Sequence, residues 1–219
     1  MTNTIPTNEE MRMDEIKKDL LRLGVATLYE AAGRRGLMAG AELLVGVPFA
    51  GQAHTAEIPA GDNLGLHNGL RAPERTGDIY CVASAGKGRY GVIGELLVEQ
   101  LRAGAWQAIV LDDAIRDIDL LEAPPSVAAR GICSRGTVKR RAGRVNVDIS
   151  LGGILVRPGD WVVGDRDGVV VIPEGRVLNV LAAAETRLAK ETRIAELVRT
   201  GATVLAANLT ATEELAASS

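Results

Sequence analysis

The feature that most constrains the fold is one strand–helix–strand unit near the middle of the chain. Residues 79–84 are typical of a buried strand, and a glycine-rich loop over 86–91 follows them. The next apolar residues recur at helical spacing as far as Gly104, and a short apolar run over 108–111 comes after them. Because such a crossover is right-handed and its strands are parallel, the loops after the two strands emerge at the same edge of the sheet.

Further helical and strand patterns lie on both sides of this unit. The apolar spacing predicts two short helices over 13–32 that meet at Gly24, and one long helix over 173–200. Strand signals occur over 43–58, 136–149, 154–156, 161–163 and 169–172. One short helical pattern occurs over 64–70. The small and polar residues 202–219 are expected to be partly disordered. We therefore expect an α/β fold with helices at both ends.

Length and composition favour one soluble domain over 1–219, with a folded core over about 13–201 between flexible ends. Of the 219 residues, 47% are hydrophobic, and the net charge of −3 offers no basic face to nucleic acid. Cys81 and Cys133 are expected to be reduced. Because no run of about 18 apolar residues occurs, we expect a cytoplasmic protein that binds neither nucleic acid nor membrane.

Two loops that the central unit brings together carry the candidate chemistry. Residues 94–97 begin its helix, and residues 112–117 follow its second strand. The backbone amides at a helix N-terminus favour an anion such as a carboxylate, and Arg116 can grip carboxylate or enolate oxygens in a bidentate manner. The two loops therefore predict a site for a small organic acid.

Two carboxylates in these loops suit a metal. Glu95 and Asp117 are hard oxygen ligands, which Mg²⁺ or Mn²⁺ prefer, with waters completing an octahedron. Each residue also has a purely structural interpretation: Glu95 complements the helix dipole, and 116–117 is a surface turn.

The glycine-rich loop has an alternative interpretation. Residues 86–91 read G-x-G-x-x-G after a strand, and Asp112 lies about 20 residues further on, as in dinucleotide-binding units. However, only one strand–helix–strand unit is expected, and residues 92–94 delay the helix beyond the third glycine. We therefore favour a flexible loop at the site over a nicotinamide dinucleotide site.

Other polar residues receive no catalytic role from the sequence. Lys87 is flanked by glycines, which predicts a solvated amine rather than a Schiff-base lysine in a dry pocket. His54 and His67 lack the neighbours of a zinc site, and His67 is at most a pocket-lining residue. The basic runs 34–35 and 139–141 are expected to be solvated.

Separated motifs along the chain resemble one known family. The likeness extends from about residue 23 to about residue 201 and is carried by 24–31 (GVATLYEA), 94–97 (GELL), 112–117 (DDAIRD) and 168–173 (GVVVIP). Together they resemble the class II pyruvate aldolases of the 4-hydroxy-4-methyl-2-oxoglutarate aldolase type, a family shared with regulator of ribonuclease E activity A. The resemblance implies a layered β/β/α core of the swivelling-domain type, in a homotrimer or homohexamer whose sites lie at subunit interfaces.

The resemblance also implies how a substrate is held. A pyruvate carboxylate would be bound by the backbone amides of Gly94, Glu95, Leu96 and Leu97, chiefly the last two. Arg116 would face the C2 oxygen and stabilise an enolate. Retro-aldol cleavage of a 4-hydroxy-2-oxo acid and decarboxylation of oxaloacetate leave the same pyruvate enolate, so one site is expected to serve both reactions.

The metal and its ligands are implied in the same way. Asp117 would bind Mg²⁺ or Mn²⁺ directly. Glu95 and, from a neighbouring subunit, Glu191 would join through metal-bound waters. Glu30 would help to position groups at the same site. The chain is therefore expected to be a divalent-metal-dependent lyase.

The sequence departs from the family at one point of the site and leaves one alternative function. Asp113 and Ala114 stand where the family usually has small residues, often glycine, so an additional carboxylate is expected near the metal. Family members of the regulator type bind a ribonuclease and are not enzymes. Such a protein can dispense with the carboxylates, whereas this chain retains Glu95, Arg116 and Asp117, which favours the lyase.

Overall fold

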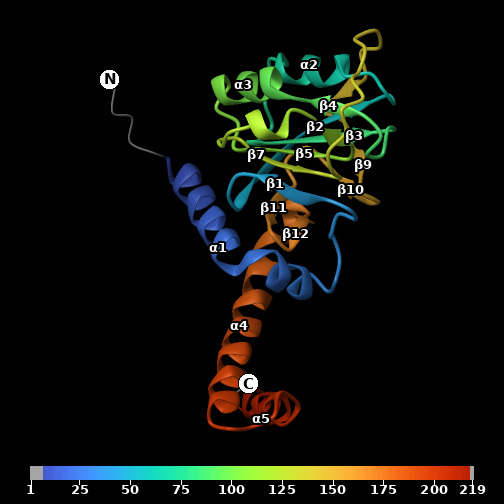
Figure 1. Cartoon of the computed structure of the whole chain (residues 1–219). Helices are drawn as coiled ribbons and strands as arrows, with labels where there is room; N and C mark the ends of the chain where they lie inside the picture. Colours follow the sequence, from blue (N-terminus) through green and yellow to red (C-terminus); the bar gives the residue numbers. More distant parts are fainter. Residues whose placement is uncertain (1–6, 218–219) are drawn as a thin grey trace.

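The fold is built around a curled sheet of eight strands, seen in a computed structural model that describes residues 7–217 (Figure 1). Its four middle strands are parallel, and the strands at both edges are antiparallel to their neighbours. The order across the sheet is β1 (Glu42–Val45), β7 (Ser126–Ala129), β5 (Ala108–Leu111), β3 (Ile79–Ser84), β2 (Phe49–Ile58), β11 (Trp161–Asp165) and β12 (Gly168–Ile172), with β8 (Arg144–Val145) paired to β2.

The predicted strand–helix–strand unit is confirmed. Helix α3 (Glu95–Ala103) connects the parallel strands β3 and β5, and the amide of Asp112 donates to the Val82 carbonyl at 3.0 Å. The loops after β3 and β5 therefore leave the same edge of the sheet. The helix begins later than its apolar pattern does, because β4 (Gly91–Ile93) precedes it and pairs with β6 (Ala114–Ile115).

The sheet is covered on both faces. Helices α2 (Leu64–Leu70) and α3 pack on one face, and the hairpin of β9 (Ile149–Leu151) and β10 (Ile154–Val156) packs on the other. Strand β3 shows the alternation directly: Tyr80 and Val82 belong to the helix side, and Ile79, Cys81 and Ala83 belong to the hairpin side. This arrangement is the layered β/β/α core that the resemblance implies.

The two terminal helices cover the β11–β12 end of the sheet. Helix α1 (Asn8–Ala31) and helix α4 (Val177–Arg199) bury their apolar faces there. The predicted break at Gly24 is present as a kink with φ 73°, and the amide of Val25 donates to Asp165 Oδ2 at 2.8 Å. Within residues 7–217, we find no helix that combines the length and apolar character needed to cross a membrane.

The C-terminal part projects from the sheet as a helical arm. Helix α4 runs away from the core, and α5 (Val204–Ala217) turns back against its far end (Figure 1). The expectation of partial disorder is thus wrong for 204–217, since α5 buries Ala207 and Ala211 and Arg193 pairs with Glu214 at 2.8 Å. The remaining ends, 1–6 and 218–219, lie outside the described residues.

The stretch 136–149 differs from its prediction. Only β8, with two residues, and the first residue of β9 are strand, although the whole stretch alternates. The backbone amides of Arg140 and Arg141 instead donate to Asp62 Oδ2, each at 3.0 Å. A buried carboxylate just before α2 therefore satisfies groups that a strand ladder would otherwise pair. Strand β7, which follows a Pro-Pro pair, was not anticipated by the pattern.

Candidate functional site

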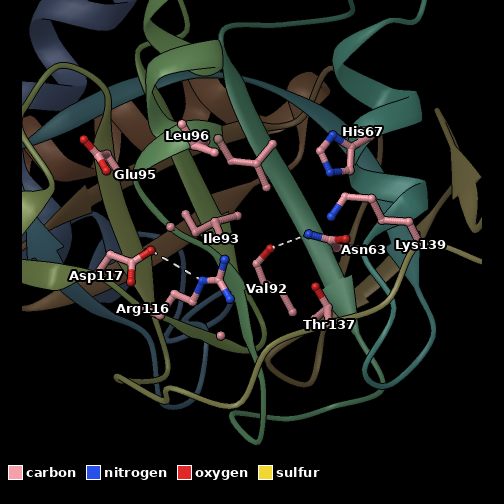
Figure 2. A pocket seen from close by; sticks show the side chains of 13 residues that line it. Asn63, His67, Val92, Ile93, Glu95, Leu96, Arg116, Asp117, Thr137 and Lys139 are labelled. Carbon is pink, nitrogen blue, oxygen red and sulfur yellow. Dashed lines mark hydrogen bonds and ion pairs between the residues drawn. The ribbon is translucent and has the colours of Figure 1, made fainter.

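A cavity of about 350 Å³ opens where the predicted loops meet (Figure 2). One side is formed by 91–97, which contains β4 and the start of α3, and by Arg116 and Asp117 after β6. The other side is formed by Asn63, His67, Thr137 and Lys139. The two loops predicted from topology therefore do meet, and they share the cavity with two segments that the sequence did not connect.

The N-terminus of α3 presents backbone donors to this cavity. Gly94 is the N-cap and has no side chain to satisfy them, while the amide of Leu97 donates to the Gly94 carbonyl at 3.1 Å. The amides of Glu95 and Leu96 have no intrahelical acceptor, because they occupy the first two positions of the helix. These two amides, rather than that of Leu97, are the donors best placed for an anion.

Glycines around Arg116 let it lie close against the backbone. The Arg116 amide donates to the Ile93 carbonyl at 2.9 Å, which fixes the loop beside β4. A Cβ atom added at Gly91 would lie 3.0 Å from Arg116 Cβ, and one added at Gly136 would lie 3.1 Å from Arg116 Nη1. The guanidinium is therefore held against bare backbone while 48% of the side chain stays exposed to the cavity and solvent.

Asp117 lies beside Arg116 in an unusual backbone conformation. Its φ of 58° is left-handed, which costs on the order of 1 kcal/mol for a residue other than glycine. This turn brings Oδ2 to 3.4 Å from Arg116 Nε, and a side chain at Gly94 would overlap the same oxygen. The strain directs a half-exposed carboxylate toward the start of α3.

Two carboxylates, those of Glu95 and Asp117, belong to the cavity of one chain. In the part of the chain that the structure describes, no three His, Cys, Asp or Glu residues form a metal-holding cluster. Mg²⁺ is commonly held by one or two carboxylates with waters and substrate oxygens. The residues present therefore fit a divalent metal that a bound substrate helps to coordinate.

Asp113 corrects one expectation, because it is not an extra carboxylate of the metal site. It is fully buried and accepts hydrogen bonds from Ser84 Oγ, from the Tyr90 amide at 2.9 Å and from the Ala114 amide at 3.0 Å. Both oxygens are used to hold the glycine-rich loop against β6. A Cβ at Gly86 would overlap this carboxylate, so the loop needs glycine there.

The glycine-rich loop does not have the geometry of a dinucleotide site. It leads into β4 rather than into a helix N-terminus. Asp112, the acid expected to bind a ribose, is fully buried, and its two oxygens pair with Lys87 and Arg130. The Lys87 side chain is about half exposed, at 51%, which agrees with its prediction as a solvated amine.

Asn63, Thr137 and Lys139 are cavity residues that sequence reasoning missed. The backbone around Val138 pairs with 61–63, and Asp62 accepts from the amides of Arg140 and Arg141, so a segment more than 70 positions downstream reaches α2. The basic run 139–141 is exposed, as predicted, and its first residue also lines the cavity.

His67 lines the cavity, as predicted, and its surroundings disfavour the charged form. Burial lowers the pKa of its imidazole below the ordinary value, and the nearby positive charge of Lys139 lowers it further. His67 is therefore mainly neutral at pH 7.

Glu30 and Glu191 lie outside the cavity of their own chain. Both pair with Arg187, at 3.6 Å for Glu30 and 2.9 Å for Glu191, and Arg34 also pairs with Glu30 at 3.1 Å. Glu191 belongs to the part of α4 that forms the projecting arm. The fold does not bring either residue to the site within one subunit.

A layered core thus carries a cavity lined by a helix N-terminus, an arginine and two carboxylates. The chain belongs to the RraA-like family, described as Aldolase/RraA, whose family model matches residues 25–171. A relative from Halalkalibacterium halodurans, named "Putative 4-hydroxy-4-methyl-2-oxoglutarate aldolase", is 34% identical over 142 residues, which are 64% of this chain and 67% of the relative. A relative of the same name from Hahella chejuensis is 35% identical over 99 residues, covering 45% of this chain and 60% of the relative.

Solved structures share the fold. A protein of Pseudomonas syringae pv. tomato matches with a TM-score of 0.74 and 23% identity over 95% of this chain and all of that one. RraAS2 of Streptomyces coelicolor, described as an unusual member of the RNase ES inhibitor RraA family, matches with a TM-score of 0.70 and 27% identity over 85% of this chain and 97% of that one. The chain spans about 60% of the second curated relative, so the activity of the whole relative is not transferred by similarity alone.

Proposed function

We propose that this chain is a divalent-metal-dependent lyase that cleaves a 4-hydroxy-2-oxo acid to pyruvate through an enolate and also decarboxylates oxaloacetate. The observation that carries the proposal is the meeting of Arg116, the first amides of α3 and two carboxylates in one cavity. This combination suits a 2-oxo acid, whose carboxylate and adjacent carbonyl present three oxygens on one side. The family membership and the names of the relatives support the aldolase part of this proposal.

The protein groups act on different oxygens of the substrate. The amides of Glu95 and Leu96 bind the carboxylate, and the guanidinium of Arg116 stabilises the charge that develops on the C2 oxygen. Because that charge appears only as the C3–C4 bond breaks, a donor fixed in advance lowers the barrier more than it strengthens binding. The backbone contact of Arg116 and its glycine surroundings supply this fixed position.

Asp117 and Glu95 would hold the metal, Mg²⁺ or Mn²⁺. When bound, the metal would supply Lewis-acid stabilisation of the same enolate oxygen. Asp117 is oriented for this role by its left-handed backbone, and its carboxylate stays accessible beside Arg116. The neighbouring arginine, 3.4 Å away, helps to align the carboxylate.

We further propose that the enzyme works as a homotrimer or homohexamer in which Glu191 of a neighbouring subunit completes the site. The projecting arm of α4 and α5 supports this arrangement, since it carries Glu191 away from its own cavity and exposes Leu205 and Leu209. A small 2-oxo acid would be the ligand, and we expect a cytoplasmic protein without nucleic-acid or membrane partners.

A regulator that binds a ribonuclease is the second candidate function, and the likeness to RraAS2 favours it. One experiment separates the two. Pyruvate formation from oxaloacetate and from 4-hydroxy-4-methyl-2-oxoglutarate is followed with lactate dehydrogenase, with Mg²⁺, with a chelator, and with the Arg116→Ala variant. The lyase requires turnover that depends on metal and on Arg116. Absence of turnover with every metal, together with inhibition of a ribonuclease E-type enzyme, would establish the regulator.

A further inference from the structure

His67 is a titratable cavity residue to which the enolate chemistry above gives no role. It lies on α2, on the side of the cavity away from Arg116 and Asp117, with Lys139 next to it (Figure 2). Among the described residues its buried Nε2 atom has no hydrogen-bond partner. The histidine is therefore uncommitted, unlike the other histidine of the chain, His54, whose two ring nitrogens bond Thr76 and the Gly69 carbonyl.

The wall around His67 holds a second unpaired polar atom. Asn63 is only 4% exposed, and its Nδ2 donates to the Val92 carbonyl at 2.9 Å, but its buried Oδ1 has no partner within residues 7–217. Buried polar atoms in folded proteins are nearly always paired, so two unpaired ones on one wall of a cavity indicate a wall arranged for polar groups of a ligand.

The surroundings of His67 favour the neutral imidazole, which is the form that can accept a proton. Lys139 lies on the same wall, and Arg116, Glu95 and Asp117 lie on the other side of the cavity. Burial and Lys139 both lower the pKa of His67. A neutral ring is therefore available at pH 7 at the end of the cavity away from the enolate site.

We propose that His67 is the general base that removes the C4 hydroxyl proton in retro-aldol cleavage, an inference that rests on the proposed function. The hydroxyl proton passes to an imidazole nitrogen, the C4–O bond becomes the carbonyl of the leaving fragment, and the C3–C4 bond breaks. Its electron pair forms the enolate that Arg116 stabilises. The imidazolium then returns the proton to C3, so that one 4-hydroxy-2-oxo acid yields one carbonyl compound and one pyruvate.

Oxaloacetate gives an internal comparison, because its decarboxylation needs the same enolate site but has no C4 hydroxyl to deprotonate. A general base contributes about 100-fold to 10,000-fold in rate. Removing His67 should therefore lower cleavage far more than decarboxylation. Removing Arg116 should lower both reactions together.

The test compares His67→Gln with Arg71→Gln, a control at the exposed end of the same helix. Both are assayed with Mg²⁺ on 4-hydroxy-4-methyl-2-oxoglutarate and on oxaloacetate, and the ratio of the two kcat/KM values is the readout. We expect the cleavage-to-decarboxylation ratio to fall at least about 100-fold in His67→Gln and to stay constant in Arg71→Gln. An unchanged ratio, whether both activities fall or neither does, overturns the role of His67.

A pH profile adds a readout that a merely structural role would not move. The cleavage kcat/KM should fall on the acid side as His67 becomes protonated. Lys139→Met should move this acid limb to higher pH, because the nearby positive charge that lowers the histidine pKa is gone. An acid limb unmoved in Lys139→Met would contradict the inference. If the wild-type protein turns over neither substrate, the proposed function fails first, and this inference fails with it.

Discussion

The acids of the segment 112–117 divide into two environments within six residues. Asp112 and Asp113 are fully buried, and each carboxylate has both oxygens occupied by protein donors. Asp117 is 41% exposed, lies on a left-handed residue and has Arg116 as its neighbour at 3.4 Å. The first two acids maintain the loops, and the third faces the cavity that those loops create.

The difference shows that identical side chains in one motif are distinguished by burial and by partner count. A fully buried carboxylate with protein donors on both oxygens presents no accessible oxygen to a metal or substrate. A half-exposed carboxylate next to one cation keeps lone pairs available. Variants that disturb the buried acids Asp112 and Asp113 should therefore change stability. Variants at the exposed pair Arg116 and Asp117 should change activity.

The largest effect is expected on the buried side, from Arg130→Met. This change removes a cation from the fully buried Asp112, to which only the half-exposed Lys87 would remain paired. We expect a loss of about 3 kcal/mol in the free energy of unfolding, because an undercompensated buried charge is costly. Urea denaturation measures it, and a loss below about 1 kcal/mol would show that Asp112 is not held as described.

On the open side, Arg116→Ala should reduce pyruvate formation by about 100-fold or more, equivalent to roughly 2.7 kcal/mol of transition-state stabilisation. The side chain is half exposed, so the urea midpoint should stay close to that of the wild type. Arg140→Ala, an exposed arginine on the segment beside the cavity, is the matched control and should retain activity. Equal losses of stability and activity in Arg116→Ala would remove the distinction between the two environments.

Much of the fold followed from the sequence, because its elements are local. The alternation of 79–84 and the helical spacing that ends at Gly104 are written in neighbouring residues, and the parallel pairing of β3 and β5 follows from crossover handedness. The stretch 136–149 was misjudged because its backbone bonds a carboxylate at Asp62, far away in sequence. The C-terminal helix was missed because its small residues gain stability only against α4.

The candidate site was predictable on one side only. Arg116, Asp117 and the start of α3 meet because two consecutive loops share a sheet edge, and this is a topological argument. The wall containing Asn63 and Lys139 depends on a contact between segments more than 70 residues apart, for which one sequence gives no signal. Asp113 could not be assigned either, since its role depends on amides that only the folded loop presents.

A pH measurement extends the comparison of buried and exposed groups to the buried histidine His54. Burial lowers the pKa of the fully buried His54, so the unfolded chain binds a proton more readily than the folded one. The stabilisation is fully present above the unfolded pKa of about 6.5 and is lost as the pH falls from there toward the folded pKa, by at most about 1.4 kcal/mol per pH unit. Urea midpoints at pH 7.5 and 5.5 should show this decrease, and a smaller decrease is expected in His54→Asn.

The smallest effect is expected from Lys87→Met, on the same carboxylate that Arg130 holds. Lys87 also pairs with Asp112, but its side chain is 51% exposed, against 24% for Arg130. An ion pair whose cation is solvated contributes about 1 kcal/mol or less, so the urea midpoint should move only slightly and pyruvate formation should persist. A loss as large as that of Arg130→Met would mean that exposure of the cation does not decide the strength of these pairs. A loss of activity with unchanged stability would instead show that Lys87 acts on the reacting groups. The glycine-rich loop would then be part of the candidate site.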